Sequence, residues 1–303
     1  MQYKFLRGLF LRSLGTLVIT ILVSLAFAQG KIAREPLTID FGDFQTKAEL
    51  THPAQGKGPF PAVILIPGSG PEDMNASIFS FGADGKPIFL SSIFKQVSSH
   101  LSENGFAVLR YNKHYVTGPG QADFEKFYTQ LDMQQMLADA GKVLAKAEAN
   151  PKVKKGQIFL YGWSEGSAVA AALAAKHPEL AGLIVQGPVS ESWRGLFLYQ
   201  ILSVGLPYVR QVSSDERVSV DTLKALQTGD GGLVAKGILN YLGDPVKFQR
   251  GKLAVNPALD TDKDRVLEKS ELTPKAFGNL LDTHTSRHKA SRLSIPRNAR
   301  CPT

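Results

Sequence analysis

The sequence predicts an α/β protein whose sheet is mostly parallel and carries helices on both faces. Between residues 37 and 186, short apolar runs alternate with stretches that repeat apolar residues at helical spacing. This rhythm is typical of parallel strands joined by helical crossovers. The run at 62–66 is apolar throughout, as expected of a strand buried on both faces. A serine between two glycines, at 162–166, separates a predicted strand from a predicted helix.

The first predicted elements open the sheet. They are an antiparallel pair of strands at 37–41 and 47–51, a strand at 62–66, a helix at about 88–103 and a strand at 106–111. The helix is expected to end at Asn104-Gly105, because glycine readily adopts the left-handed conformation of a C-cap.

The next elements repeat the helix and strand pattern twice. They are a helix at 132–149, a strand at 157–161, a helix at 167–176 and a strand at 182–186. Pro151 and Pro178 are expected to stop the two helices, because the residue before a proline disfavours helical geometry.

The strand–helix rhythm stops near Gly187. Later stretches at 193–209, 220–227 and 232–242 keep helical spacing and predict a small helical cap. The predicted division is a signal peptide at 1–28, an α/β core at 29–190, the helical cap at 191–255, an EF-hand-like acidic loop at 256–273 and a basic tail, expected to be disordered, at 274–303.

Composition and charge exclude several classes of protein. The chain has 303 residues, of which 43% are hydrophobic and 20% charged, so collagen-like, coiled-coil and wholly disordered proteins are excluded. The net charge of +8 comes from the two ends, 1–28 and 283–303, which hold basic but no acidic residues. No nucleic-acid partner is expected, because the body lacks a basic excess. The single cysteine, Cys301, permits neither an intramolecular disulfide nor a cysteine zinc site.

Residues 1–28 have the pattern of a cleaved secretory signal. A basic start that ends at Arg12 precedes an apolar run at 14–25, and Ala26-Phe27-Ala28 has the small-x-small pattern of a signal peptidase site. We therefore expect cleavage after Ala28 and a secreted or periplasmic protein. It would associate with a membrane only if the signal remained uncleaved.

The pentapeptide Gly-Trp-Ser-Glu-Gly at 162–166 predicts a catalytic serine at Ser164. In this motif a strand meets a helix at a turn too sharp for side chains at its flanks, so the serine hydroxyl stands clear of the sheet. The helix dipole then favours the negative charge that develops beside it. The glycine-rich turn at 67–71 follows the strand at 62–66. It can offer an amide as one half of an oxyanion hole, with the amide of Glu165 as the other half.

These residues resemble those of the α/β-hydrolase superfamily and, more narrowly, of secreted bacterial serine hydrolases. Gly-Ser-Gly-Pro-Glu-Asp at 68–73 fits that group's Gly-Ser-Gly-Pro-x-Asp motif. Arg-Tyr-Asn-Lys-His-Tyr at 110–115 resembles its Arg-Tyr-Asp-Lys-Arg-Gly motif and departs from it in the last two positions. The resemblance covers roughly residues 36–190.

The resemblance implies an α/β-hydrolase fold and the hydrolysis of a small-molecule ester or related acyl bond, with no organic cofactor. It implies Ser164 as the nucleophile and the amides of Glu165 and Ser69 as the oxyanion hole. Enzymes with peptidase, lipase and lactonase activities use the same Gly-x-Ser-x-Gly turn, which we call the elbow. These three activities therefore remain alternatives to esterase activity.

A serine nucleophile needs a base, which in this superfamily follows the serine in chain order. Only His284 and His288 qualify, because His177 lies about 20 Å along the helix that starts at Ser164. Both lie in the predicted tail with no strand to position them, and exposed histidines without a role are the alternative. We therefore expect a fold that is incomplete at its C-terminal end, and we hypothesise that the chain is truncated or frame-shifted near residue 282. The second functional hypothesis is a catalytically inactive, calcium-modulated binding protein on the same fold.

Acidic residues at 260–271 follow the spacing of an EF-hand calcium loop. Oxygen-bearing side chains occupy positions one, three, five, nine and twelve, and position seven offers a backbone carbonyl: Asp260, Asp262, Asp264, Glu268, Glu271 and Val266. Calcium, which takes six to eight oxygen ligands, is therefore the expected ion. Arg265 stands at position six, where EF-hand loops have glycine, and is expected to weaken binding. A solvated acidic turn before a helix is the alternative.

Overall fold

A computed structural model describes residues 31–81, 87–244, 247 and 252–285 of the chain. The predicted signal peptide with its cleavage position, and His288 with the end of the predicted tail, lie outside the described residues.

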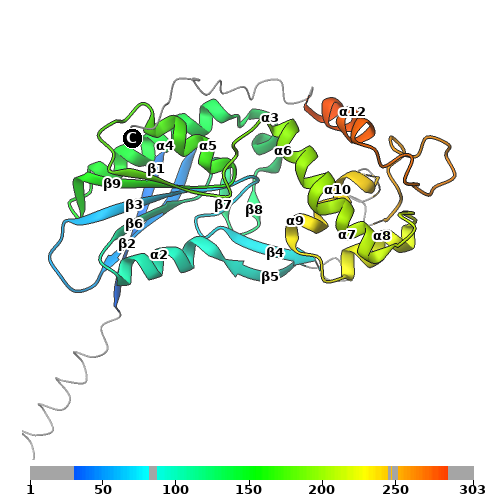
Figure 1. The fold of residues 1–303 in the computed structure, drawn as a ribbon. Helices are drawn as coiled ribbons and strands as arrows, with labels where there is room; N and C mark the ends of the chain where they lie inside the picture. Colours follow the sequence, from blue (N-terminus) through cyan, green and yellow to red (C-terminus); the bar gives the residue numbers. More distant parts are fainter. Residues whose placement is uncertain (1–30, 82–86, 245–246, 248–251, 286–303) are drawn as a thin grey trace, which may run out of the picture.

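A six-stranded sheet forms the centre of the first half of the chain (Figure 1). Its strands lie in the order β1 (Ile32–Asp40), β2 (Gln45–Pro53), β6 (Ala107–Tyr111), β3 (Phe60–Ile66), β9 (Val153–Trp163) and β10 (Gly182–Gln186). β1 and β2 pair antiparallel, as do β2 and β6, whereas β6, β3, β9 and β10 run parallel. The predicted α/β class with a mostly parallel sheet is confirmed.

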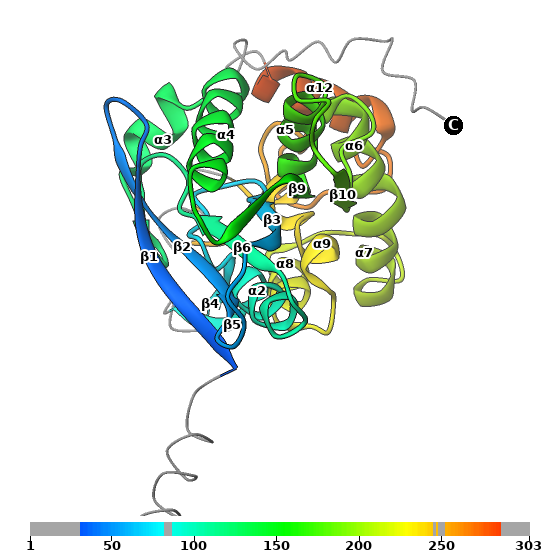
Figure 2. The same ribbon diagram turned by 90° about the vertical axis from the view of Figure 1, so that its left-hand side faces the viewer.

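Helices cover both faces of the sheet, because its central strands are apolar on both sides. α4 (Met133–Glu148) and α5 (Glu165–Ala174) lie on one face and α2 (Ile93–Glu103) lies on the other (Figures 1 and 2). Alternate residues of β3 separate the two layers. Ile64 belongs to the core under α4 and α5, whereas Leu65 belongs to the core under α2.

The predicted helix at 88–103 begins later than expected. Helix α2 begins at Ile93, and the preceding residues form β5 (Pro87–Ser92), which pairs antiparallel with β4 (Ser77–Phe81). The prediction was wrong for 88–92 because the short continuous apolar run Ile88-Phe89-Leu90 fits a strand as well as a helix. A second small hairpin and a helix then lead to α4: β7 (Val116–Gly118), β8 (Gln121–Ala122) and α3 (Phe124–Gln130).

The second half of the chain is helical. Its elements are α6 (Trp193–Gln200), the π-helical turn η1 (Ile201–Gly205), α7 (Leu206–Val212), α8 (Val220–Thr228), α9 (Leu233–Lys236), α10 (Leu239–Leu242) and α12 (Pro274–Thr285). These helices lie beside the sheet, on the side where β7 and β8 are found (Figure 1). None of the helices in the described ranges is both long and apolar enough to cross a bilayer.

One hydrophobic core joins the helical half. It includes Leu223 of α8, Leu267 and Leu272 of the acidic segment and Phe277 of α12. The predicted boundaries at residues 255 and 273 therefore do not separate packing units. The expectation of a disordered tail is wrong for its first part, because α12 buries apolar side chains in this core.

Candidate active site

Ser164 lies at the turn between β9 and α5, at the carboxyl edge of the sheet. Its backbone has φ 50° and ψ −119°, a left-handed conformation that costs about 1–3 kcal/mol for a residue other than glycine. The side chain is half-buried. The strand–turn–helix context that the pentapeptide predicts is therefore present.

Two glycines allow this turn. A Cβ atom at Gly162 would lie 2.6 Å from the carbonyl oxygen of Gly166, and one at Gly166 would lie 2.4 Å from the carbonyl oxygens of Ile66 and Pro67. Any larger residue would push β9, α5 and the end of β3 apart. The glycines thus bring three backbone segments together around the serine.

Hydrogen bonds fix the strained turn. The amide of Ser164 donates to the carbonyl of Gln186 at 2.9 Å, at the end of β10. Ser167 Oγ donates to the carbonyl of Ser164 at 2.6 Å and accepts from the amide of Val189 at 3.0 Å. Ser167 was not predicted as a site residue, although its hydroxyl, one helical turn after Ser164, was visible in the sequence.

Both predicted oxyanion amides lie beside the serine. Glu165 is the first residue of α5, where an amide has no acceptor within the helix. Ser69 is exposed in the turn after β3. The position that a Cβ would take at the preceding Gly68 is 3.4 Å from Ser164 Cβ, so this turn lies directly against Ser164.

A buried lysine holds the turn at residues 67–71, which we call the oxyanion turn because it carries the predicted oxyanion amide of Ser69. Lys113 Nζ donates to the carbonyl of Gly68 at 2.8 Å and pairs with Glu165 Oε2 at 3.1 Å. The amide of Gly68 donates to Glu72 Oε2 at 2.8 Å. Burial raises the pKa of Glu72 to about 7, although nearby Lys113 opposes the rise. These contacts connect the Gly-Ser-Gly-Pro-Glu-Asp motif to the Arg-Tyr-Asn-Lys motif.

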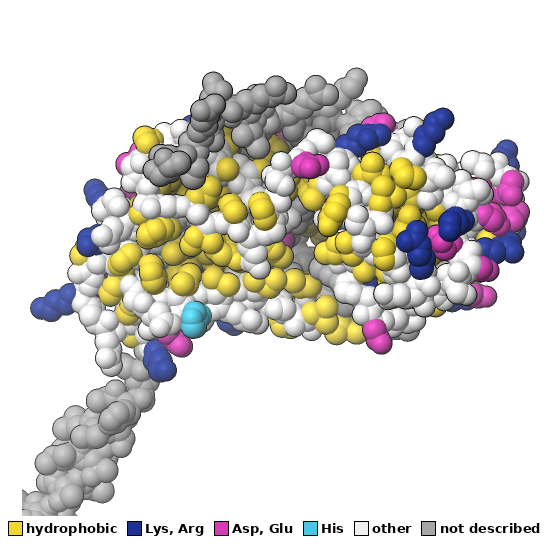
Figure 3. Space-filling view, in the orientation of Figure 1, with side chains coloured by type: hydrophobic (Ala, Val, Ile, Leu, Met, Phe, Trp, Pro, Cys, Tyr) yellow, Lys and Arg dark blue, Asp and Glu magenta, His cyan; other side chains and the backbone are white. Residues whose placement is uncertain are grey.

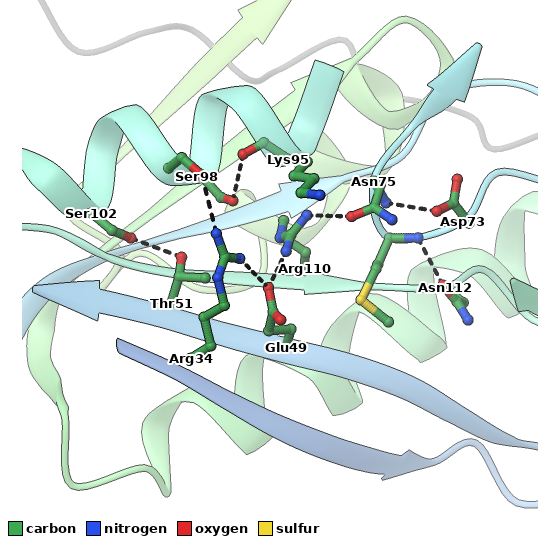
Figure 4. Close-up of polar contacts among 12 residues, drawn as sticks. Arg34, Glu49, Thr51, Asp73, Asn75, Lys95, Ser98, Ser102, Arg110 and Asn112 are labelled. Carbon is green, nitrogen blue, oxygen red and sulfur yellow. Dashed lines mark hydrogen bonds and ion pairs between the residues drawn. The ribbon is translucent and has the colours of Figure 1, made fainter. Parts of the chain in front are cut away.

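Arg110 of the second motif makes further contacts with the segment that follows the first motif (Figure 4). Arg110 is 2% exposed. It donates to Asn75 Oδ1 at 2.6 Å and contacts the carboxylate of Glu49 on β2. Asp73 accepts from the amide of Asn75, and Asn112 Oδ1 accepts from the amide of Met74 at 2.8 Å. The motif residues thus build the support for the oxyanion turn, which the sequence resemblance did not reveal.

A small cavity lies behind this support. It is lined by Ile66, Pro67, Tyr111, Lys113, His114, Met136, Asp139 and Val169. His114 Nδ1 lies 2.8 Å from Asp139 Oδ2, and its ring stacks on Phe41. Burial raises the pKa of Asp139, and the hydrogen bond with His114 opposes the rise. This buried pair faces the cavity and joins the segment after β6 to α4.

The structure describes the backbone of only one of the two predicted bases. His284 lies in the last turn of α12, which packs against α6, and His288 lies outside the described residues. His52 and His177 have their rings bonded to Glu35 and Glu179. Among the side chains that the structure describes, no hydrogen bond joins Ser164 to a histidine.

The predicted calcium ligands lie together in the helical half. Carboxylate oxygens of Asp260, Asp262 and Asp264 are within 4.8 Å of one another, as are those of Asp262, Glu268 and Glu271. Acidic side chains gather at the end of the molecule where Figure 1 draws this segment in orange, whereas hydrophobic side chains dominate the sheet half of the same face (Figure 3). This cluster is separate from the elbow.

Comparison with known proteins agrees with this geometry. Residues 90–237 match the family described as serine aminopeptidase, S33. This range contains the elbow. The family match and the order of strands in the sheet indicate the same fold. The chain has an α/β-hydrolase fold.

One curated relative is Esterase EstD of Thermotoga maritima, which is 25% identical over 173 residues. The match covers 57% of this chain, and the chain spans 36% of the length of that relative. Among solved structures, the α/β hydrolase GrgF from Penicillium matches with a TM-score of 0.39 and 18% identity, covering 79% of this chain and 71% of that one. A glucuronoyl esterase from Solibacter usitatus matches with a TM-score of 0.35 and 12% identity, covering 52% and 47%. These two likenesses are distant.

Proposed function

We propose that this protein is an exported serine hydrolase that cleaves an ester or related acyl bond of a small molecule. The observation that carries the proposal is the strained backbone of Ser164, held between two close-packed glycines at the start of α5. Strain of this kind persists only where the surrounding structure imposes it, and it is frequent at catalytic residues. The similarity to Esterase EstD supports ester hydrolysis.

In the proposed reaction Ser164 Oγ attacks the carbonyl carbon of the substrate. The oxyanion would accept hydrogen bonds from the amides of Glu165 and Ser69, aided by the dipole of α5. Collapse of the tetrahedral intermediate releases the alcohol and leaves an acyl-serine, which water then hydrolyses. We propose His284 or His288 as the base that takes the proton from Ser164, and a periplasmic or secreted location after cleavage at Ala28.

The test is labelling of the full chain with a fluorophosphonate probe, which modifies activated serines. Ser164→Ala is expected to abolish labelling and to lower hydrolysis of an activated ester at least about a thousandfold. His284→Ala and His288→Ala, made separately, are expected to identify the base by a comparable loss in one of them.

Ser69→Ala is the matched control, because it removes an exposed hydroxyl and keeps the amide that the mechanism uses. It is expected to retain labelling. Labelling of Ser164→Ala as strong as that of the wild type would contradict the proposal.

The second candidate is a catalytically inactive, calcium-modulated binding protein. The observation that favours it is that the histidine side chains that the structure describes form no hydrogen bond with Ser164. A correctly folded chain that neither reacts with the probe nor hydrolyses esters would support this function over the first.

A further inference from the structure

Two loops of the helical half are joined back to back. We call residues 211–222 the hydroxyl loop and residues 260–271 the acidic loop. Val218 of the hydroxyl loop and Leu267 of the acidic loop form an antiparallel bridge, with N–H···O distances of 2.8 Å and 3.0 Å. Both residues are fully buried, so the helical core fixes the two loops relative to each other.

The two loops share two backbone features at equivalent positions. Two residues before the bridge, each loop places a non-glycine residue in the left-handed region: Glu216 with φ 57° and Arg265 with φ 70°. One residue earlier, each has an aspartate that accepts a hydrogen bond from the amide two residues ahead, at 3.2 Å for Asp215 and 2.8 Å for Asp264. Counting from the bridge therefore aligns the loops position by position.

In the hydroxyl loop, side chains of the loop donate hydrogen bonds to the backbone carbonyl at its centre. The carbonyl of Arg217 accepts from Ser213 Oγ at 2.9 Å and from Thr222 Oγ1 at 3.2 Å. Ser213 Oγ also lies 2.7 Å from Asp215 Oδ1. Ser213 and Thr222 take the places that Asp262 and Glu271 take in the acidic loop, so hydroxyls stand where the acidic loop has carboxylates.

In the acidic loop, one buried carboxylate oxygen is left without a hydrogen-bond donor from the described residues. Asp260 is 8% exposed, and one of its oxygens accepts from the amide of Arg265 at 3.1 Å. Its other oxygen, Oδ1, is fully buried and has no hydrogen-bond partner in the part of the chain that the structure describes. Asp260 also shares its cluster with the carboxylates of Asp262 and Asp264. A buried carboxylate oxygen is costly without a partner, and here its neighbours repel it.

We propose that the acidic loop binds one Ca²⁺ per chain and that the hydroxyl loop binds none. The ligands are carboxylate oxygens and one backbone carbonyl: Asp260, Asp262, Asp264, Val266, Glu268 and Glu271. A ligand set of oxygens alone on a loop of this length suits Ca²⁺, which accepts irregular geometry, better than Mg²⁺, which requires a near-ideal octahedron. This inference is independent of the hydrolase function proposed above.

Binding would exchange contacts within the loop. Glu271 Oε1 accepts from the amide of Thr261 at 2.5 Å and from its hydroxyl at 2.6 Å, and Oε2 accepts from the amide of Glu268 at 3.1 Å. Glu268 pairs with Arg217 of the hydroxyl loop at 3.1 Å. The cation would replace part of these contacts and draw both glutamates toward Asp262. Because Leu267 belongs to the helical core, we expect this ordering to stabilise the whole helical half.

The test is isothermal titration calorimetry of the full chain with CaCl₂ after treatment with a chelator, together with thermal unfolding. We expect one site with a dissociation constant of about 10⁻⁵–10⁻³ M, and a melting temperature that rises with calcium. Asp260→Asn is expected to weaken binding at least about tenfold. Titration with MgCl₂ in place of calcium is expected to give binding at least about tenfold weaker.

Ser213→Ala in the hydroxyl loop is the matched control and is expected to leave calcium affinity within about twofold of the wild type. Asp262→Asn, at an exposed position, serves if Asp260→Asn does not fold, and is expected to lose affinity too. Absence of both heat and a thermal shift at 10 mM calcium would overturn the proposal. So would a stoichiometry of two, or full calcium affinity in both aspartate variants.

Discussion

The two halves of the molecule treat buried negative charge in opposite ways. In the sheet half, three buried or half-buried carboxylates each lie against a basic side chain of the same chain. The pairs are Glu49 with Arg110, Glu165 with Lys113 and Asp139 with His114. In the acidic loop, five carboxylates form two overlapping groups of three, and one of them, Glu268, pairs with the exposed Arg217.

The two halves therefore differ in what stabilises their buried carboxylates. A carboxylate in a low-dielectric interior needs a cation or several donors close by. The sheet half carries its cations in its own sequence, so the elbow is expected to keep its shape without a metal. The helical half is expected to depend on a cation from solution.

Removal of an internal cation should break the pattern in the sheet half. Arg110→Met leaves Glu49 without its buried partner and Asn75 without its donor. Loss of one member of a buried pair costs about 3–5 kcal/mol, so the free energy of unfolding in urea should fall by that amount. Arg34→Met is the control, because Arg34 contacts the same carboxylate from an exposed position. It should cost below about 1 kcal/mol. Equal losses in the two variants would contradict the role assigned to Arg110.

Glu72 tests the balance of charge at the oxyanion turn. Its pKa is raised by burial from 4.5 in the unfolded chain to about 7 in the folded protein. Between these two pH values the unfolded state ionises Glu72 while the folded state keeps it protonated, so stability falls as the pH rises through this window. The loss should reach about 3 kcal/mol.

Glu72→Gln should remove this part of the pH dependence, and unfolding in urea at pH 4.5 and pH 8 measures it. Glu103→Gln, at an exposed position in α2, is expected to leave the pH dependence as it is in the wild type. A pH dependence in Glu72→Gln as steep as that of the wild type would mean that Glu72 does not titrate in this window.

Arg265→Gly sharpens the contrast in the acidic loop. The substitution relieves a left-handed backbone that costs about 1 kcal/mol, and it removes a positive charge beside the proposed cation. Unfolding free energy should rise by about 1 kcal/mol, and calcium affinity should rise about fivefold in calorimetry.

Glu216→Gly is the control for the change of backbone, because Glu216 has the same backbone conformation in the hydroxyl loop; it also removes the ion pairs of Glu216 with Arg210 and with Lys269 of the acidic loop. It is expected to leave calcium affinity unchanged. An Arg265→Gly chain that binds calcium more weakly than the wild type would contradict the model of a strained sixth position.

Local patterns in the sequence predicted much of the fold. The helix predicted at 132–149 is α4, and the strand predicted at 182–186 is β10, because periodicity and capping residues act over a few neighbouring positions. The segment 88–92 was misassigned because its spacing of apolar residues fits two structures. The single core of the helical half was also missed, since composition changes at residues 255 and 273 gave no information about which side chains pack together.

The active-site support was less accessible from the sequence. Ser164 and the amides beside it follow from a local motif, whereas the contacts of Arg110 and Lys113 join segments more than thirty residues apart. The hydroxyl loop escaped notice for a different reason. Its serine and threonine carry no net charge, so only the backbone reveals its likeness to the acidic loop.

The contacts of Arg110 have a consequence for how this molecule can evolve. Glu49 lies on the antiparallel strand β2, and a single side chain, Arg110, joins it to Asn75 in the segment that follows the oxyanion turn. A substitution at any of these three positions would alter the contacts that support the oxyanion turn beside Ser164. Glu49, Arg110 and Asn75 should therefore vary together across descendants, or stay fixed as a set, even while the surrounding surface diverges.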